Sequence, residues 1–95
     1  MSGYRIHRQV TEFGEHVRGW RMVLGLTAQQ VSERAGITRD TLRKIESGNP
    51  NVSFNSVTQV LRALGILDQL VDAADPLASD IGRLRAGRLT RTRAR

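Results

Sequence analysis

Apolar residues recur at three- and four-residue spacings along most of this chain, a period that predicts amphipathic helices. One type of helix start occurs three times: Thr or Ser follows an apolar residue and precedes a second apolar residue by four positions. The hydroxyl can accept a hydrogen bond from the first turn, and the apolar pair closes across it. The three starts are Leu26-Thr27 with Val31, Ile37-Thr38 with Leu42, and Val52-Ser53 with Val57. The predicted helices are 11–24, 28–35, 39–47, 54–64 and 68–74.

Glycines mark the ends of these predicted helices. Gly25, Gly36 and Gly65 each precede an apolar residue, the arrangement in which a left-handed glycine lets the last carbonyl groups be satisfied. Gly48 differs, because a polar loop rather than an apolar residue follows it. The first helix is expected to turn one apolar face to the core, made of Val17, Trp20 and Leu24.

The two ends of the chain differ from this helical body. Residues 1–10 are expected to form a loose leader. Asp75 and Pro76 can start one more, marginal helix, with Asp75 as N-cap and Pro76 at the first helical position. That helix would carry a narrow apolar stripe of Leu77, Ile81 and Leu84. We therefore divide the chain into a leader (1–10), a helical domain (11–75) and a C-terminal arm (76–95).

The composition excludes several classes of protein. Hydrophobic residues make up 39% and charged residues 25%, as in soluble globular chains, and no apolar run is long enough for a secretory signal or a membrane span. The absence of cysteine excludes disulfides and thiolate metal sites. The histidines are isolated, and no Walker loop, GxSxG or HExxH motif occurs. We expect a cytoplasmic protein that is not an enzyme and holds no metal or cofactor.

Charge is concentrated in the arm. The arm contains six arginines and one aspartate, which gives it a net charge of +5. Residues 1–75 therefore carry only +1 of the total of +6. A nearly neutral body can still bind DNA if its cations share one face.

The predicted helix over residues 39–47 has such a face. If Leu42 and Ile45 point inward, the opposite side carries Arg39, Asp40, Arg43, Lys44 and Ser47. Arginine and lysine can engage guanine or phosphate in a major groove, and a carboxylate can accept a hydrogen bond from cytosine. The alternative is that Asp40 and Lys44 form an exposed ion pair on a solvated helix face. The position of this helix, second in a tight helix-turn-helix, favours the DNA interpretation.

Residues 17–64, with the pattern LT-x-x-x-V…AGIT-x-x-TL-x-x-IE-x-G, resemble the Xre/Cro/C1 family of phage and bacterial repressors. The resemblance implies an all-α, five-helix repressor-like DNA-binding domain with a basic C-terminal arm. Such a domain inserts helix 39–47 into the major groove of double-stranded DNA, usually as a homodimer on an inverted repeat.

The resemblance also assigns roles to individual positions. Arg39, Asp40 and Lys44 would read bases, and Arg21 with Glu46 would form a structural ion pair between helices. The family often has glutamine at the position of Ala28, so the neighbouring Gln29 is the candidate for that phosphate contact. The full set of implied DNA-binding residues is Gln29, Thr38, Arg39, Asp40, Thr41, Arg43, Lys44, Asn49, Asn51 and Ser53.

The run LGILDQLVDAADPLASDIGRLRA is similar to the ends of HipB-like antitoxins, which accompany HipA-type kinase toxins and repress their own operons. This implies that the arm binds a partner toxin through Leu77, Ile81, Leu84, Arg83 and Arg85. We therefore predict a sequence-specific transcriptional repressor, with an antitoxin role as its setting. The alternatives are a toxin-neutralising interaction protein with weak DNA binding, and a stand-alone or phage-type repressor. An aromatic content of 4% speaks against binding single strands by stacking.

Overall fold

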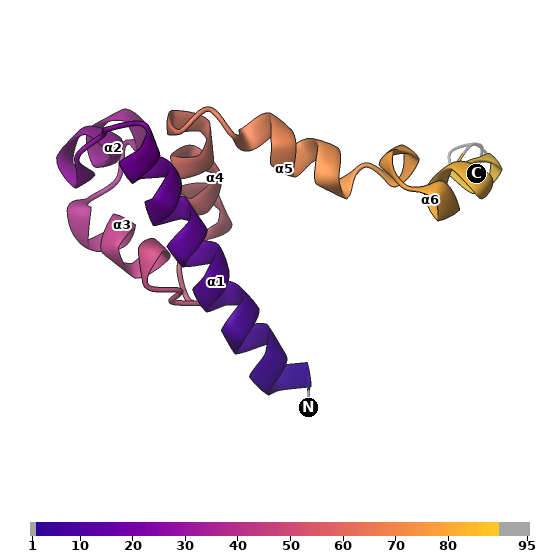
Figure 1. Ribbon diagram of the computed structural model, residues 1–95, viewed down its shortest axis with the longest axis horizontal. Helices are drawn as coiled ribbons and strands as arrows, with labels where there is room; N and C mark the ends of the chain where they lie inside the picture. Colours follow the sequence, from indigo (N-terminus) through magenta and orange to yellow (C-terminus); the bar gives the residue numbers. More distant parts are fainter. Residues whose placement is uncertain (1, 90–95) are drawn as a thin grey trace.

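The computed structural model describes residues 2–89, and all regular structure in that range is helical (Figure 1). The elements are α1 (Ser2–Val23), α2 (Ala28–Ala35), α3 (Arg39–Glu46), α4 (Phe54–Ala63), α5 (Leu67–Ala74), the 3-10 helix η1 (Pro76–Ala78) and α6 (Asp80–Leu84). The predicted all-α fold class is confirmed. Within the same residues, none of the helices combines the length and the apolar character needed to cross a membrane.

The three repeated helix starts form as local chemistry predicts. The hydroxyl of Thr27 accepts a hydrogen bond from the Gln30 amide at 3.0 Å, and the Gln30 side chain accepts one in return from the Thr27 amide at 2.8 Å. Thr38 and Ser53 cap α3 and α4, each accepting from the amide three residues on. Gly36 turns the chain between α2 and α3 with φ of +69°, a conformation that costs glycine little. These contacts fix where α2, α3 and α4 begin.

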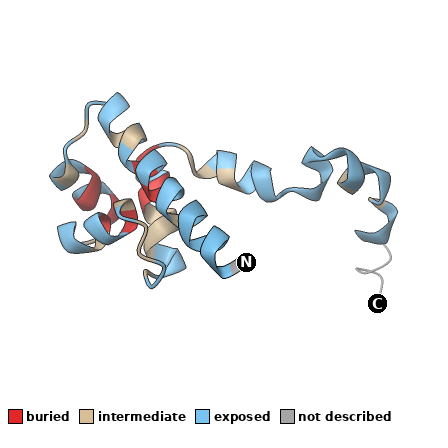
Figure 2. Ribbon diagram, turned by 60° about the horizontal axis from the view of Figure 1, so that its bottom comes forward, coloured by how far each residue is buried: buried red, intermediate tan, exposed pale blue. Residues whose placement is uncertain are grey.

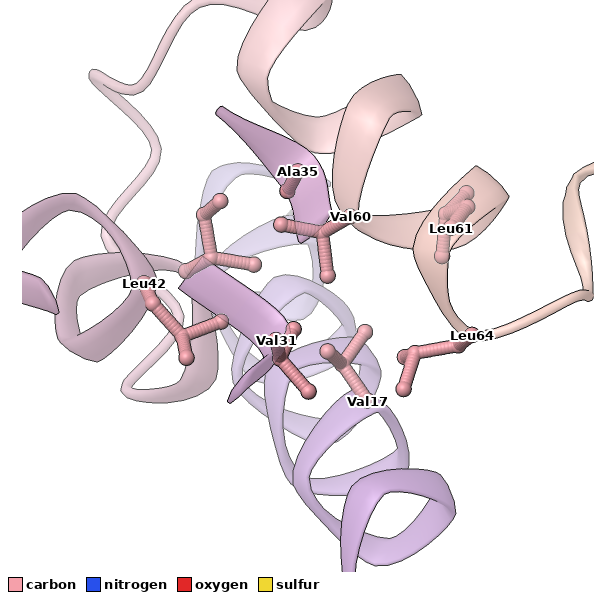
Figure 3. Close-up of a cluster of buried hydrophobic side chains, with 8 residues drawn as sticks. Val17, Val31, Ala35, Leu42, Val60, Leu61 and Leu64 are labelled. Carbon is pink, nitrogen blue, oxygen red and sulfur yellow. The ribbon is translucent and has the colours of Figure 1, made fainter. Parts of the chain in front are cut away.

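The hydrophobic core lies where α1, α2, α3 and α4 meet (Figures 2 and 3). Each of its side chains is at most 5% exposed, and they come from all four helices and the C-cap of α4. The buried set is Val17, Val31, Ala35, Leu42, Ile45, Val60, Leu61 and Leu64. One polar side chain is buried beside them, and its hydrogen bond is satisfied: the Ser32 hydroxyl donates to the carbonyl of Ala28 at 2.7 Å. This core holds α2 and α3 against α1 and α4.

Two glycines allow α1 to approach the end of α3. A Cβ at Gly14 would lie 2.5 Å from the carbonyl oxygen of Ile45 and 2.7 Å from that of Glu46. A Cβ at Gly48, which follows α3 with φ of +79°, would lie 2.6 Å from the Cα of Thr11. The backbones of α1 and α3 therefore meet at a distance that leaves no room for a side chain at either position. The sequence patterns had marked Gly48 only as a helix end and had assigned no role to Gly14.

The predicted loose leader over residues 1–10 is wrong wherever the structure describes it. Helix α1 begins at Ser2 and runs unbroken through the expected start at Thr11. The Thr11 hydroxyl donates to the carbonyl of His7 at 3.0 Å, one turn back in the same helix. The apolar spacing of its second half continues through Ile6, Val10 and Phe13, although Ile6 and Phe13 are exposed. This first part of α1 projects beyond the body (Figure 1).

Of the apolar face expected on α1, only Val17 is buried. Trp20 is 41% exposed and Leu24 is 46% exposed, so the prediction that they belong to the core is wrong. The inward face of α1 runs instead from Gly14 and Val17 to Arg21, which pairs with Glu46 of α3. Trp20 lies to one side of this face, and Leu24 follows the end of α1.

Helix α5 leads away from the body. Leu67 and Leu70 in its first half pack against the core, but Val71 is 60% exposed and α5 contains no buried residue. Helix α5 continues into η1 and α6, which belong to the C-terminal arm, on the side of the body away from α3 (Figure 1). The first half of α5 therefore packs on the body, and its second half leads into the arm.

The arm contains the predicted cap but not one continuous helix. The Asp75 carboxylate accepts from the Leu77 amide at 2.9 Å, yet η1 ends after one turn and Ser79 caps α6 anew. Gly82 makes this fold-back possible, because a Cβ there would overlap the carbonyl group of Pro76. A glycine that weakens a regular helix is thus needed for close packing in the arm.

Candidate nucleic-acid interface

Helix α3 is anchored to the core by its apolar face, and its polar face points outward. Leu42 and Ile45 are 1% and 4% exposed and fix its inner side, as the helical wheel predicts. The residues on the opposite side are all exposed: Arg39, Asp40, Arg43, Lys44 and Ser47. Helix α3 lies on the side of the body away from the arm, so no described segment covers this face (Figure 1). A face of this kind can enter a groove without rearrangement of the core.

Asp40 connects the cations of this face in the free protein. One carboxylate oxygen lies 2.5 Å from Nη2 of Arg43, and the other lies 3.3 Å from Nζ of Lys44. The hydrogen bond from Arg43, followed by that from Lys44, lowers the pKa of Asp40 below its ordinary value. Both the ion pair foreseen as the alternative and the outward-facing cations are therefore present. Because exposed ion pairs of this type are weak, DNA phosphates can replace Asp40 as the partner of either cation.

The hydroxyl and amide groups around α3 and α4 are mostly held by local turns. The hydroxyls of Thr38 and Thr41 lie 2.9 Å apart in the α3 cap, with Thr38 donating. In the loop between α3 and α4, the Asn49 side-chain oxygen accepts from the Asn51 amide at 2.8 Å. Ser53, the cap of α4, is exposed. These residues flank α3 in the sequence on both sides. The side-chain oxygens of Thr38, Thr41, Asn49 and Ser53 already have hydrogen-bond partners.

Gln29 lies at the start of α2 and points along its own helix. Its amide nitrogen donates to a carboxylate oxygen of Glu33 at 2.7 Å, on the exposed side of α2. The residue that lines the cleft between α1 and α3 is instead Ala28, whose small side chain leaves that space open. Gln29 is therefore not among the residues that line this cleft.

Arg21 and Glu46 form an ion pair that joins α1 to α3. Nε of Arg21 lies 2.7 Å from one oxygen of Glu46, and Nη2 lies 3.0 Å from the other. A third donor, Nη1 of Arg21, reaches the carbonyl of Leu26 at 3.3 Å. The side chains are only 15% and 11% exposed, and the hydrogen bonds to Glu46 raise the pKa of Arg21 above its ordinary value. This geometry holds the end of α3 against α1.

A cleft of about 650 Å³ opens between α1, the start of α2 and α3. It contains one residue that the sequence analysis missed, Arg18. Four arginines from α1 and α3 line the cleft, together with two acidic residues. The full lining of the cleft is Arg18, Arg21, Ala28, Arg39, Asp40, Leu42, Arg43, Glu46 and Ser47. The missed signal was positional: Arg18 lies one helical turn before Arg21 on α1, and therefore on the side that faces α3.

Comparisons with known proteins agree with this geometry. Residues 12–74 match the family model described as a helix-turn-helix domain, which is more than half of the chain. This chain belongs to the helix-turn-helix domain family. A protein of Methanothermobacter thermautotrophicus named as an uncharacterized HTH-type transcriptional regulator is 39% identical over 49 residues, or 52% of this chain and 71% of the relative. No solved structure matches the chain significantly. In the matched region, α2 and α3 are the two consecutive short helices joined by the turn at Gly36.

Proposed function

We propose that this protein is a sequence-specific, double-stranded DNA-binding regulator of transcription that acts as a repressor. The observation that carries the proposal is the outward face of α3, where Arg39, Asp40 and Lys44 are exposed on a helix anchored by Leu42 and Ile45. These side chains supply donors for guanine and an acceptor for cytosine on one rigid element. The name of the Methanothermobacter thermautotrophicus relative supports a role in transcription.

The proposed mechanism separates positioning from reading. Arg43 and Thr41 lie beside the base-reading residues and approach the DNA backbone as α3 enters the groove. The cap of α4 at Ser53 and the loop residues Asn49 and Asn51 border the far end of α3 and would approach the adjacent backbone. In this mechanism the backbone contacts set register, and α3 supplies the sequence preference.

We propose that two copies bind one operator. A single short helix reads only a few base pairs, so a two-fold dimer on an inverted repeat doubles the specific contacts. The molecule exposes enough apolar surface for such an assembly. Thirteen large hydrophobic side chains are exposed within residues 2–89, more than the eight hydrophobic residues that are buried in the core. Footprints are expected to show half-sites about one helical turn apart or a multiple of it.

A second candidate function, capture of a protein partner, is favoured by the arm. Leu77 in η1 is 48% exposed, and Ile81 and Leu84 in α6 are 58% and 81% exposed. Both elements project from the body (Figure 1). Exposed apolar side chains of this kind support capture of a protein partner. The resemblance to HipB-like antitoxins is the basis for proposing that the partner is a HipA-like kinase toxin and that the complex represses its operon. Arg83 bonds within the arm, to Asp80 and to the Leu77 carbonyl, whereas Arg85 is exposed. Co-purification with the product of a neighbouring HipA-like gene tests this setting. The negative control is a variant that carries serine at positions 77, 81 and 84.

The experiment that tests DNA reading starts from selection of preferred sites in random duplex DNA. Arg43→Ala combined with Lys44→Ala is expected to abolish binding to the selected site while the circular dichroism spectrum stays unchanged. The matched control removes the same charge from the exposed start of α1, with Arg5→Ala and Arg8→Ala. Binding that survives the first pair of changes, or is lost equally with the control pair, would overturn the assignment of α3.

A further inference from the structure

We propose that the first half of α1, residues 2–13, is the surface that joins two copies of this chain, with the two helices packed antiparallel about a two-fold axis beside Gln9. The proposal rests on the two-fold DNA binding proposed above and names the surface that produces it. The occupant of this surface is a second copy of the same helix, because the apolar and charged residues of the segment complement themselves when the helix is reversed.

The first half of α1 is helical without being packed into the body. Residues 3–9 and 11–13 are exposed, and Val10 is half-buried. The helix nevertheless begins at Ser2, and this part of it projects from the body (Figure 1). A helical segment of this length is marginal in water unless it packs against another surface. A second helix would provide that surface.

An apolar stripe with the spacing of paired helices runs along this segment. Ile6, Val10 and Phe13 are separated by four and three residues, and Trp20 follows Phe13 after seven. A repeat of three and four is the pattern of the seam between two packed helices. Ile6 and Phe13 are 55% and 36% exposed, so both are available to a partner.

The stripe lies on the flank of α1 away from the reading face of α3. Arg18, which lines the cleft beside α3, lies about 140° from Phe13 around the helix, on the other side of the inward face formed by Gly14 and Val17. Neither Ile6 nor Phe13 lines that cleft. A second copy on the stripe therefore leaves α3 free to enter a groove.

The charges of the segment select an antiparallel pair. Arg5 and Arg8 come first along the helix, and Glu12 and Glu15 follow. All four are exposed, and none of these side chains has a hydrogen-bond or ion-pair partner within residues 2–89. Parallel helices would set like charges against each other, whereas antiparallel helices bring the basic part of each copy to the acidic part of the other. Charges that flank a seam fix orientation in this way.

The apolar and charged contacts agree on one register. When Ile6 of one copy packs on Phe13 of the other, the two-fold axis falls between positions 9 and 10. Arg5 then faces position 14 of the second copy, about 3 Å along the axis from Glu12, which is within reach of a long side chain. The two-fold axis repeats this contact, and each Glu12 supplies an acidic group near the first turn of the other α1, which contains none of its own.

Charge reversal tests the pairing of Arg5 with Glu12. Exposed ion pairs are weak, so removing the Arg5 charge with alanine should change self-association little. Arg5→Glu and Glu12→Arg each turn two attractions into two repulsions and are expected to weaken self-association about tenfold in sedimentation equilibrium. An equimolar mixture of the two variants is expected to recover the native affinity. The controls Arg8→Glu and Glu15→Arg reverse charges on the side of α1 away from the stripe and should leave self-association unchanged.

Introduced thiols test the orientation, since the chain contains no cysteine. Gln9→Cys lies beside the axis and is expected to give a disulfide-linked dimer on oxidation. Ile6→Cys alone is not, because the two copies of position 6 would lie about 10 Å apart along the helices, farther than a disulfide spans. A mixture of Ile6→Cys with Phe13→Cys is expected to cross-link.

Several results would overturn the interface. They are a disulfide between two copies of Ile6→Cys, self-association that neither Arg5→Glu nor Glu12→Arg changes, and a native protein that stays monomeric both free and on its selected duplex. A dimer that cross-links as expected but selects no duplex would instead overturn the proposed function and leave the interface standing. Thermal melting of each variant checks that the fold is retained.

Discussion

Replacing Gly14 by alanine tests the close contact between α1 and α3. The new methyl group would lie 2.5 Å from the carbonyl oxygen of Ile45 and 2.7 Å from that of Glu46, and both obstacles are backbone atoms that cannot rotate away. Overpacking of this kind costs roughly 1–3 kcal/mol. Alanine also gains about 1 kcal/mol over glycine in a helix interior. Because two rigid carbonyls oppose the methyl group, the upper part of the cost applies, and we expect a net loss of about 1–2 kcal/mol.

The same helix contains the control for this prediction. Gly19 has nothing within 4 Å of an added Cβ, so Gly19→Ala is expected to raise the free energy of unfolding by up to about 1 kcal/mol. In a domain of this size 1 kcal/mol shifts the melting temperature by about 4–8 °C. The two variants should therefore move in opposite directions in a thermal melt followed by circular dichroism. If Gly14→Ala melts at or above the temperature of Gly19→Ala, α1 and α3 are not in the close contact described above.

Three further variants address the charges and the arm. Asp40→Asn removes the shared partner of Arg43 and Lys44, so the affinity for non-specific duplex DNA should rise. The ratio of specific to non-specific affinity should fall, and an unchanged ratio would show that Asp40 has no part in discriminating between DNA sequences. Glu46→Ala strands a nearly buried guanidinium and is expected to cost about 2–4 kcal/mol in urea unfolding, whereas a native-like midpoint combined with lost DNA binding would make the residue a DNA contact. Deleting residues 76–95 should lower non-specific affinity and its salt dependence without changing base preference, and a changed preference would place the reading face elsewhere.

The parts of the fold that short-range contacts determine were predictable from the sequence. The caps at Thr27, Thr38 and Ser53 depend on hydrogen bonds to residues three positions away, so the start of each helix is encoded locally. The inward direction of Leu42 and Ile45 follows from the helical period alone. Together these features were enough to predict the exposed face of α3 and, through the resemblance, the class of domain.

The parts that were missed depend on residues far apart in the chain. Gly14 matters only because the end of α3 passes over it, and Arg18 lines a cleft only because α1 crosses the start of α2 and α3. The exposure of Trp20 and the outward course of α5 were likewise hidden, because an apolar spacing shows that a face exists but not what covers it. The sequence alone therefore determined α2, α3 and α4, their caps and the polar face of α3. Only the packing of one helix on another decided which glycines cannot be replaced, which cations face one another, and which apolar surfaces remain open, since each of these depends on distances between backbones that no local pattern specifies.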